Sequence, residues 1–471
     1  MILKTLGFVV FFALAAVALG TADPELETCR HQCRVQMAFD RQQREACLDK
    51  CERYIQEKEG RQEERGGGSS GRREEEGRGG EDDNPYVFQP RHFRTAHRSQ
   101  QGRFSVLPRF TERSNQFEGI ENFRFGILEV ESKTFVAPNH LDADLIGLVA
   151  EGEGTLDIIQ KNKKKSYDIR VGSIVFIPAG ATSYLVNTDN NNKLVIIKLI
   201  QTISTPGRFE FFFGTGRNSF LRAFKSSILE AAYDESKETI QRVLRGRDDS
   251  PFIQVSDEQL KSLRKESDTI WPFKTDKSSS SKPVDIFKHK SVSNNYGQLF
   301  EVDNDDFKEL GDIEVAFANI TRGGMLGPLF NTRATKLAFV VDGKGWAQMA
   351  CPQVSSQTER SEEGAIPTYE TVNAQLRPGT LFVIPPGNPY VSIASQDDNL
   401  QIVCFDINAD NNERVALAGK NNLYSNMDDV AKEVSFGVSS KLVDKVFEND
   451  DDLELFSKGP EWQQSEDRAD Q

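Results

Sequence analysis

The chain has 471 residues, which predicts two to four domains at the usual domain size of roughly 100–200 residues. A composition of 37% hydrophobic and 28% charged residues is typical of a protein with folded cores. The 72 acidic and 58 basic residues give a net charge of −14, which argues against nucleic acid as a partner because phosphate backbones repel an acidic chain.

The N-terminus has the layout of a secretory signal peptide. Residues 1–4 end in the basic Lys4, an apolar run follows over residues 5–19, and Ala18 and Gly20 supply small side chains for cleavage. We therefore predict a signal peptide over residues 1–22. A membrane anchor is disfavoured because the run is shorter than the ~20 residues that span a bilayer. We expect a soluble protein of the secretory pathway, without a membrane partner, in a compartment that permits disulfides.

Four of the six cysteines lie in residues 23–56, as two C-x3-C pairs. Cysteines four residues apart share one face of a helix, so two antiparallel helices could be joined outer to outer and inner to inner. This pattern predicts a disulfide-linked helical hairpin with Cys29–Cys51 and Cys33–Cys47 bridges, which is one of three possible connectivities. The spacing does not fit the usual zinc patterns.

Downstream of the hairpin, the character of the sequence changes twice. Residues 57–83 are rich in Arg, Glu and Gly and lack large apolar side chains, so we expect a disordered linker. From Asn84, short apolar runs between Gly, Pro and Asn predict an all-β domain over 84–274. Within it we predict strands at 123–130, 145–149 and 194–200, helical stretches at 219–224, 227–233 and 237–244, and a helix capped by Ser256.

A second polar linker at 275–283 precedes a repeat of the same pattern. Residues 148–154 match 339–345, and residues 172–180 match 379–387, so the domain is duplicated over 284–448. Its predicted strands are 315–321, 336–341, 380–385 and 400–405, followed by a helix at 439–447. The acidic tail 449–471 is expected to be mobile.

The doubled G-x5-P-x-G motif, beside a strand pair closed by a G-x-G turn, resembles the two cupin motifs. With the Phe-rich segment 207–214 and the helical segments, the chain from Asn84 resembles the vicilins, the 7S seed storage globulins, a family with many allergens. The resemblance implies a mainly β fold of two jelly-roll barrels, each with a helical extension, and homotrimers formed through those extensions. It also implies storage in the seed vacuole and breakdown by proteases. Residues 23–56 resemble hairpinins, some of which are antimicrobial after release.

Catalytic cupins bind a metal through three His and one Glu, and both copies depart from that pattern. In the first copy, His140 fits the first ligand, while Asp142 and Ser183, which precedes Asn187, stand at two other His positions. In the second copy, the corresponding residues are Leu329, Asn331 and Tyr390. Metal sites of this kind need at least three strong donors, so we expect no metal, no cofactor and no enzyme activity.

Some vicilins bind copper elsewhere, through a Cys, two His and an N-terminal Tyr. Tyr86 and Cys351 match that set, but Gln353 and Asn388 replace the two His, and Cys351 is then a free or buried thiol. Copper binding therefore stays an alternative. Binding of a small organic ligand in an apolar barrel mouth is another.

One asparagine and two histidines are further candidate sites. The sequence Asn319-Ile-Thr321 is an N-glycosylation acceptor within a predicted strand, so we predict a glycan at Asn319 if that position faces outward. His92 and His97 flank Phe93 and are expected to be surface or interface residues rather than catalytic bases.

Overall fold

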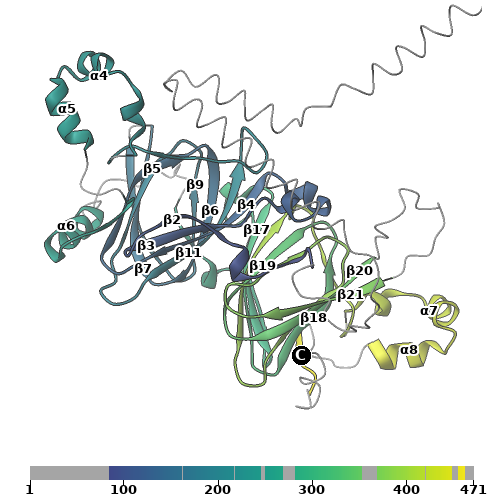
Figure 1. The fold of residues 1–471 in the computed structure, drawn as a ribbon. Helices are drawn as coiled ribbons and strands as arrows, with labels where there is room; N and C mark the ends of the chain where they lie inside the picture. The colour runs from purple at the N-terminus through teal and green to yellow at the C-terminus, as the bar shows by residue number, and fades with distance from the viewer. Residues whose placement is uncertain are drawn as a thin grey trace, which may run out of the picture. The chain divides into compact units, whose positions relative to one another are not determined.

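The computed structural model describes residues 84–161, 163–216, 218–245, 250–268, 282–352, 369–419, 421–447 and 455–461. The predicted signal peptide, the hairpin with its four cysteines and the linker 57–83 lie outside the described residues. So do most of the linker 275–283 and most of the acidic tail. The described part is mainly β, as predicted, and forms two barrels that follow one another in the chain (Figure 1).

Barrel 1 is built from two antiparallel sheets whose strands alternate between buried and exposed side chains. One sheet has the order β14 (Val284–Asp285), β9 (Ser173–Ile177), β6 (Ala143–Glu151), β11 (Leu194–Thr202), β4 (Phe123–Val130), β3 (Gly102–Val106) and β2 (Arg94–Arg98). The other has the order β12 (Phe211–Phe213), β5 (Thr134–Leu141), β10 (Thr182–Asn187), β7 (Glu153–Gln160) and β8 (Lys163–Arg170). A further strand, β13 (Phe252–Gln254), also pairs with β5.

Barrel 2 repeats this arrangement strand for strand. One sheet has the order β1 (Val87–Phe88), β22 (Leu381–Ile384), β19 (Thr335–Asp342), β24 (Leu400–Ile407), β17 (Ile313–Ile320), β16 (Gly297–Val302) and β15 (Ser291–Asn294). The other has the order β21 (Tyr369–Leu376), β20 (Gly345–Pro352), β23 (Tyr390–Ala394), β18 (Gly324–Asn331) and β25 (Arg414–Ala416), and β26 (Phe456–Lys458) also pairs with β18. The predicted duplication of the domain is confirmed by this matching order.

The G-x-G turns of the two copies have the same structural role. Gly152 joins β6 to β7 and Gly343 joins β19 to β20, both with a positive φ near 80° (78° and 81°). A Cβ atom at Gly343 would lie 1.7 Å from the carbonyl oxygen of Asn399, and one at Gly152 would lie 2.3 Å from that of Lys193. Only glycine fits such a position, so the motif marks a close approach of two backbones.

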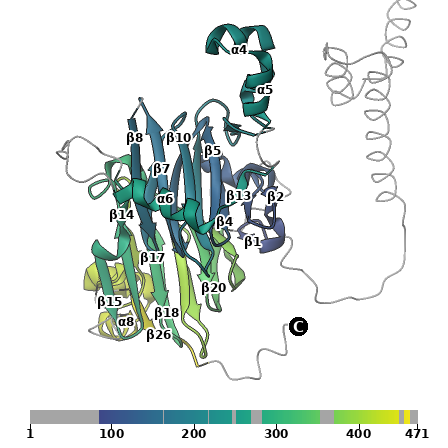
Figure 2. The same ribbon diagram turned by 90° about the vertical axis from the view of Figure 1, so that its left-hand side faces the viewer.

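A helical extension follows each barrel. The first contains η4 (Phe220–Ala223), α4 (Ser226–Tyr233), α5 (Lys237–Leu244) and α6 (Asp257–Asp268), close to the predicted bounds. The Ser256 hydroxyl accepts a hydrogen bond from the backbone N–H of Gln259, so the predicted cap is confirmed. The second contains η7 (Leu423–Asn426), α7 (Asp429–Phe436) and α8 (Ser440–Phe447). Of these, only α8 was predicted. Both helices have eight residues, but apolar side chains recur at three and four more clearly in α8 than in α7. The helices α4 and α5 in the first copy and α7 and α8 in the second project from the barrels (Figure 1), whereas α6 lies over barrel 1 (Figure 2).

After α5 and after α8, the chain returns to its barrel and closes it with one short strand. β13 brings Phe252 onto barrel 1, and β26 brings Phe456, which is fully buried, onto barrel 2. The expectation that the acidic tail is mobile was therefore wrong for residues 455–461. The sequence Phe456-Ser-Lys is too short to show a strand pattern, and tertiary packing decides its structure.

The two barrels share an aromatic core and exchange strands. β1 precedes barrel 1 in the chain but pairs with β22 of barrel 2, and β14 precedes barrel 2 but pairs with β9 of barrel 1. Between the barrels, the ring of Phe339 lies 5.3 Å from that of Phe125 and 6.2 Å from that of Phe93, measured between centroids. Each such pair contributes about 0.5–1.5 kcal/mol beyond the area that it buries.

We predict that Gly297→Ala destabilises barrel 2 by about 1–3 kcal/mol, the range for overpacking a dense core. The new Cβ would lie 2.4 Å from Cδ1 of Phe456, whose buried ring has no room to move, so β26 should detach from β18. Urea unfolding measures the loss, and hydrogen exchange at residues 456–458 locates it. Gly119→Ala is the matched control because its Cβ would meet nothing within 4 Å. Equal stability of the two variants would contradict this account of the closure.

Candidate functional site

The position expected to hold a first metal ligand in barrel 1 does not face the barrel interior. The ring of His140 stacks on Phe212 at 4.9 Å and meets Phe220 at 5.7 Å, measured between centroids. Its neighbours Asn139 and Leu141 line the interior cavity instead. The interpretation of His140 as a remaining ligand was therefore wrong. A register irregularity in the pairing of β5 with β10 shifts the inward side chains. Its sign in the sequence is Pro138, which matches Pro328 beside the same irregularity in β18.

The other positions in this set have structural roles. The carboxylate of Asp142 accepts a hydrogen bond from the backbone N–H of Glu210, at 2.8 Å. Ser183 lines the cavity, as the motif predicts. Asn187 is fully buried and donates from Nδ2 to the carbonyl oxygens of Val130 and Asn192, both at 2.9 Å. Asn187 therefore fixes a turn and is not available as a ligand.

The interior of barrel 1 contains a small cavity of about 60 Å³. Aromatic and aliphatic side chains form most of its wall, including Phe104, Phe211 and Phe252. His97 also lines it, between the rings of Phe211 and Phe213, and burial lowers the pKa of this imidazole. His97 is thus a half-buried wall residue rather than a surface one.

Lys198 of β11 is the one Lys, Arg, Asp or Glu among the side chains that line this cavity. Its ammonium lies 5.4 Å from the centroid of the Phe104 ring, and no carboxylate within the described ranges forms an ion pair with it. Burial lowers the pKa of Lys198 to about 8. Lys198 is partly exposed, but an inward cation that lacks an anion is still costly where the apolar wall replaces part of its hydration.

The interior of barrel 2 is filled by charged groups that pair with one another. The ammonium of Lys336 donates to both carboxylate oxygens of Asp406 at 2.7 Å, and Arg414 forms ion pairs with Glu301 and Glu314. Burial acts to lower the pKa of Lys336, but the Asp406 carboxylate raises it above the ordinary lysine value. Burial raises the pKa of Glu314 to about 7, although Arg414 opposes the shift.

The cupin ligand positions of barrel 2 take part in this packing. Leu329 and Tyr390 are almost fully buried, and burial raises the pKa of the Tyr390 hydroxyl to about 12. Asn331 is fully buried, and neither its Oδ1 nor its Nδ2 has a hydrogen-bond partner. An apolar side chain and two neutral ones cannot supply the donors that a late transition metal needs.

The residues that match the vicilin copper pattern do come together. Tyr86 lies within hydrogen-bonding reach of Cys351, and Asn388 donates from Nδ2 to the Cys351 sulfur at 3.3 Å. Gln353 lies outside the described residues. Burial raises the pKa of both the Tyr86 hydroxyl and the Cys351 thiol, so neither favours its ligand form. The set lacks imidazole and does not fit copper, and Cys351 is a free, buried thiol.

The rest of the described chain adds neither a metal site nor a membrane-spanning helix. Among the described residues, no three His, Cys, Asp or Glu side chains lie close enough to hold a metal ion. Within the same part of the chain, no helix is long and apolar enough to cross a membrane.

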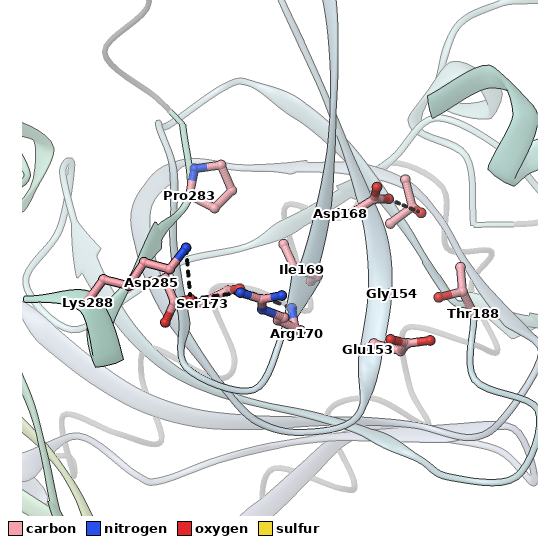
Figure 3. Close-up of a pocket in the computed structure, with 11 residues that line it drawn as sticks. Glu153, Gly154, Asp168, Ile169, Arg170, Ser173, Thr188, Pro283, Asp285 and Lys288 are labelled. Atoms are coloured by element: carbon pink, nitrogen blue, oxygen red, sulfur yellow. Dashed lines mark hydrogen bonds and ion pairs between the residues drawn. The ribbon is translucent and has the colours of Figure 1, made fainter. Parts of the chain in front are cut away.

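A larger hollow of about 540 Å³ lies where residues 283–288 reach β7 and β8 (Figure 3). Asp285 forms ion pairs with Arg170 at 3.0 Å and with Lys288 at 3.9 Å, and Thr155 donates to Asp168 at 3.1 Å. Both cations that line the hollow are thus paired with Asp285, and these contacts hold the inter-barrel segment against barrel 1. The smaller cavity around Lys198 is therefore the better candidate for a site.

Asn319 lies in β17, paired with Gln298 on one side and Gln401 on the other. Because side chains alternate along a strand, it shares a face with Phe317, whose ring contacts Phe287 of the inter-barrel segment. That is the outward face on which the sequence prediction depended, although Oδ1 of Asn319 is itself buried. Glycosylation at Asn319 stays a prediction.

Sequence reasoning missed the interior charges of both barrels. Lys198, Lys336 and Asp406 each stand within an apolar strand, where an alternating pattern would place a hydrophobic residue. A charge at an inward position of such a strand is the signal that could have found them.

Comparison with known proteins agrees with the fold. Residues 285–444 match the Cupin family model, described as "Cupin". Vicilin Pis v 3.0101 of Pistacia vera is 39% identical, over 98% of this chain and 97% of that protein. The crystal structure of vicilin from Corylus avellana, at 40% identity, covers 80% of this chain and 100% of that one with a TM-score of 0.72.

A vicilin structure from Solanum melongena, at 30% identity, covers 81% of this chain and 100% of that one with a TM-score of 0.74, and is described as having different anionic ligands in structurally similar pockets. Relatives at this identity span nearly the full length of the chain and share both barrels. The chain therefore belongs to the vicilin family, the 7S seed storage globulins.

Proposed function

We propose that the chain is a nutrient reservoir without enzyme activity, made in the secretory pathway and kept in the storage vacuole of the seed. The observation that carries this is the replacement of the cupin metal ligands by Asn139, Leu141 and Ser183 in one barrel and by Leu329, Asn331 and Tyr390 in the other. Stable, densely packed barrels suit a protein whose value lies in its amino acids. Proteases are its expected partners during processing and germination.

Abundance tests this proposal, because storage is a matter of amount and timing. Quantitative proteomics of developing and germinating seed should find the chain accumulating to a major fraction of total protein late in maturation and disappearing after germination begins. A housekeeping enzyme of the same seed is the control. A low, constant amount in seed, or equal amounts in leaf, would contradict a reservoir role.

We also propose that the chain assembles as a homotrimer through its helical extensions. Val430 and Val434 on α7, four residues apart, are 70% and 80% exposed, and Leu442 and Val446 on α8 repeat this spacing. On the first extension, Val243 of α5 is 71% exposed. Exposed apolar stripes on both extensions fit a head-to-tail contact between copies, which closes into a ring when the rotation allows.

We predict that the purified protein has about three times the mass of one chain, measured by light scattering after size exclusion. The double variant Val434→Glu/Val446→Glu should run as a monomer, because the contact would bury two charges without partners. Val171→Glu is the matched control, since Val171 is an exposed valine in the turn between β8 and β9 of barrel 1 and lies on neither α7 nor α8. A stable wild-type monomer at neutral pH would contradict the assembly.

A second function is favoured by the cavity of barrel 1. We propose that it binds a small organic carboxylate, whose anion pairs with Lys198 and whose apolar part contacts the aromatic wall. An ion pair would remove the cost of the unpaired, partly buried ammonium, and about 60 Å³ suits a ligand of acetate or propionate size. The anionic ligands of the Solanum melongena vicilin support the idea.

Isothermal titration calorimetry with acetate and propionate tests this binding. We expect one ligand molecule to bind per chain, and none to bind to Lys198→Met. Affinity should be constant between about pH 6, where the ligand is ionised, and the Lys198 pKa of about 8, and fall about tenfold per pH unit above it, as the ammonium loses its proton. His97 and Tyr184 are the other titratable groups that line the cavity. Lys163→Met, on the exposed edge strand β8, is the matched control. Unchanged binding in Lys198→Met would refute the site.

A further inference from the structure

The interiors of the two barrels can be compared position by position. Leu145 in β6 pairs with Ile200 in β11, and at the corresponding place in barrel 2, Lys336 in β19 pairs with Asp406 in β24. Two residues earlier on the second strand, barrel 1 has Lys198 where barrel 2 has Cys404. Each barrel therefore holds one inward lysine, partly buried at Lys198 and buried at Lys336, on neighbouring strands of the same sheet position and two residues apart in level.

The two lysines differ in whether the protein supplies an anion. The side chains of Lys336 and Asp406 are only 7% and 1% exposed, and both carboxylate oxygens of Asp406 accept from the ammonium. Within the described structure, the electrostatic partner of the Lys198 ammonium is the face of the Phe104 ring, and no anion pairs with it. A bidentate contact of this kind is the one that a free carboxylate would make with a buried ammonium.

We propose that Asp406 is an internal ligand: its carboxylate occupies the anion position of barrel 2, so that the chain accepts an organic carboxylate in barrel 1 only. Asp406 thus determines how many carboxylates one chain binds, and its removal turns barrel 2 into a second site. The statement about barrel 1 rests on the carboxylate binding proposed above, whereas the statement about barrel 2 does not.

The charges around Asp406 favour this reading. Glu301, Glu314 and Asp406 are the carboxylates of the cluster, and Lys336 and Arg414 are its cations. Arg414 already contacts both glutamates, which leaves Asp406 as the partner of Lys336. A free carboxylate that enters in place of Asp406 restores the same set of charges. The closure by the buried Phe456 means that entry accompanies folding, so the ligand should be present while the chain folds.

The test is chemical rescue of Asp406→Ala by formate. The full chain is refolded with and without formate, and its thermal midpoint is compared with that in chloride of equal ionic strength. We expect Asp406→Ala to melt well below wild type in chloride and to regain most of the loss in formate. Titration of ¹³C-formate, followed by NMR, should then find two bound anions per chain, against one for wild type and one for Asp406→Ala/Lys198→Met.

The double variant Asp406→Ala/Lys336→Met separates rescue from a folding defect. It lacks the buried ammonium, so it should fold without formate and show no rescue. If it folds while Asp406→Ala gains nothing from formate, the internal-ligand proposal is overturned. Two bound formates in wild type would overturn it as well.

The two proposals fail separately. If wild type binds no formate but Asp406→Ala is rescued, carboxylate binding in barrel 1 is wrong and the role of Asp406 stands. If wild type binds one formate at Lys198 and Asp406→Ala is not rescued, the role of Asp406 is wrong and binding in barrel 1 stands.

Discussion

The exchange of strands between the barrels is the constraint on which the rest of the structure depends. β1 and β14 contain two residues each. β1 precedes barrel 1 but pairs with barrel 2, and β14 precedes barrel 2 but pairs with barrel 1. So short a strand is not stable alone, and β1 is held because Phe88 packs against Phe110 and Phe117. Neither barrel can lose its exchanged strand without opening the aromatic core that both share.

This constraint treats the two interiors differently. The buried residues of barrel 2 form one continuous cluster with the interface, from Phe88 to Phe456, whereas the interior of barrel 1 is a separate cluster around Phe104 and Phe252. A void in barrel 2 would therefore loosen the contact between barrels. A cavity in barrel 1 costs only local packing. The cavity around Lys198 lies in this barrel.

The sequence predicted the regular parts of this arrangement and missed the parts that tertiary contacts decide. Strands such as β4 and β11 have eight or nine residues with clear patterns, and the matched motifs predicted the duplication. Strands of two or three residues, such as β1 and β26, have no pattern to read. The motif placed Ser183 correctly, but the register irregularity in β5 turns His140 outward, which spacing alone cannot show. To predict the charged interior of barrel 2, one must know which strands lie next to one another in the sheets.

The duplicated fold also bears on the role that we propose for the buried ion pair. The same two positions hold Leu145 and Ile200 in one barrel and Lys336 and Asp406 in the other, and both barrels close. A well-packed apolar pair is as stable as a buried ion pair or more so, so stability alone does not require the charges. Their joint presence is explained if the interior of these barrels favours a cation that needs an anion. One barrel then supplies that anion from its own chain, and the other leaves the place to a ligand.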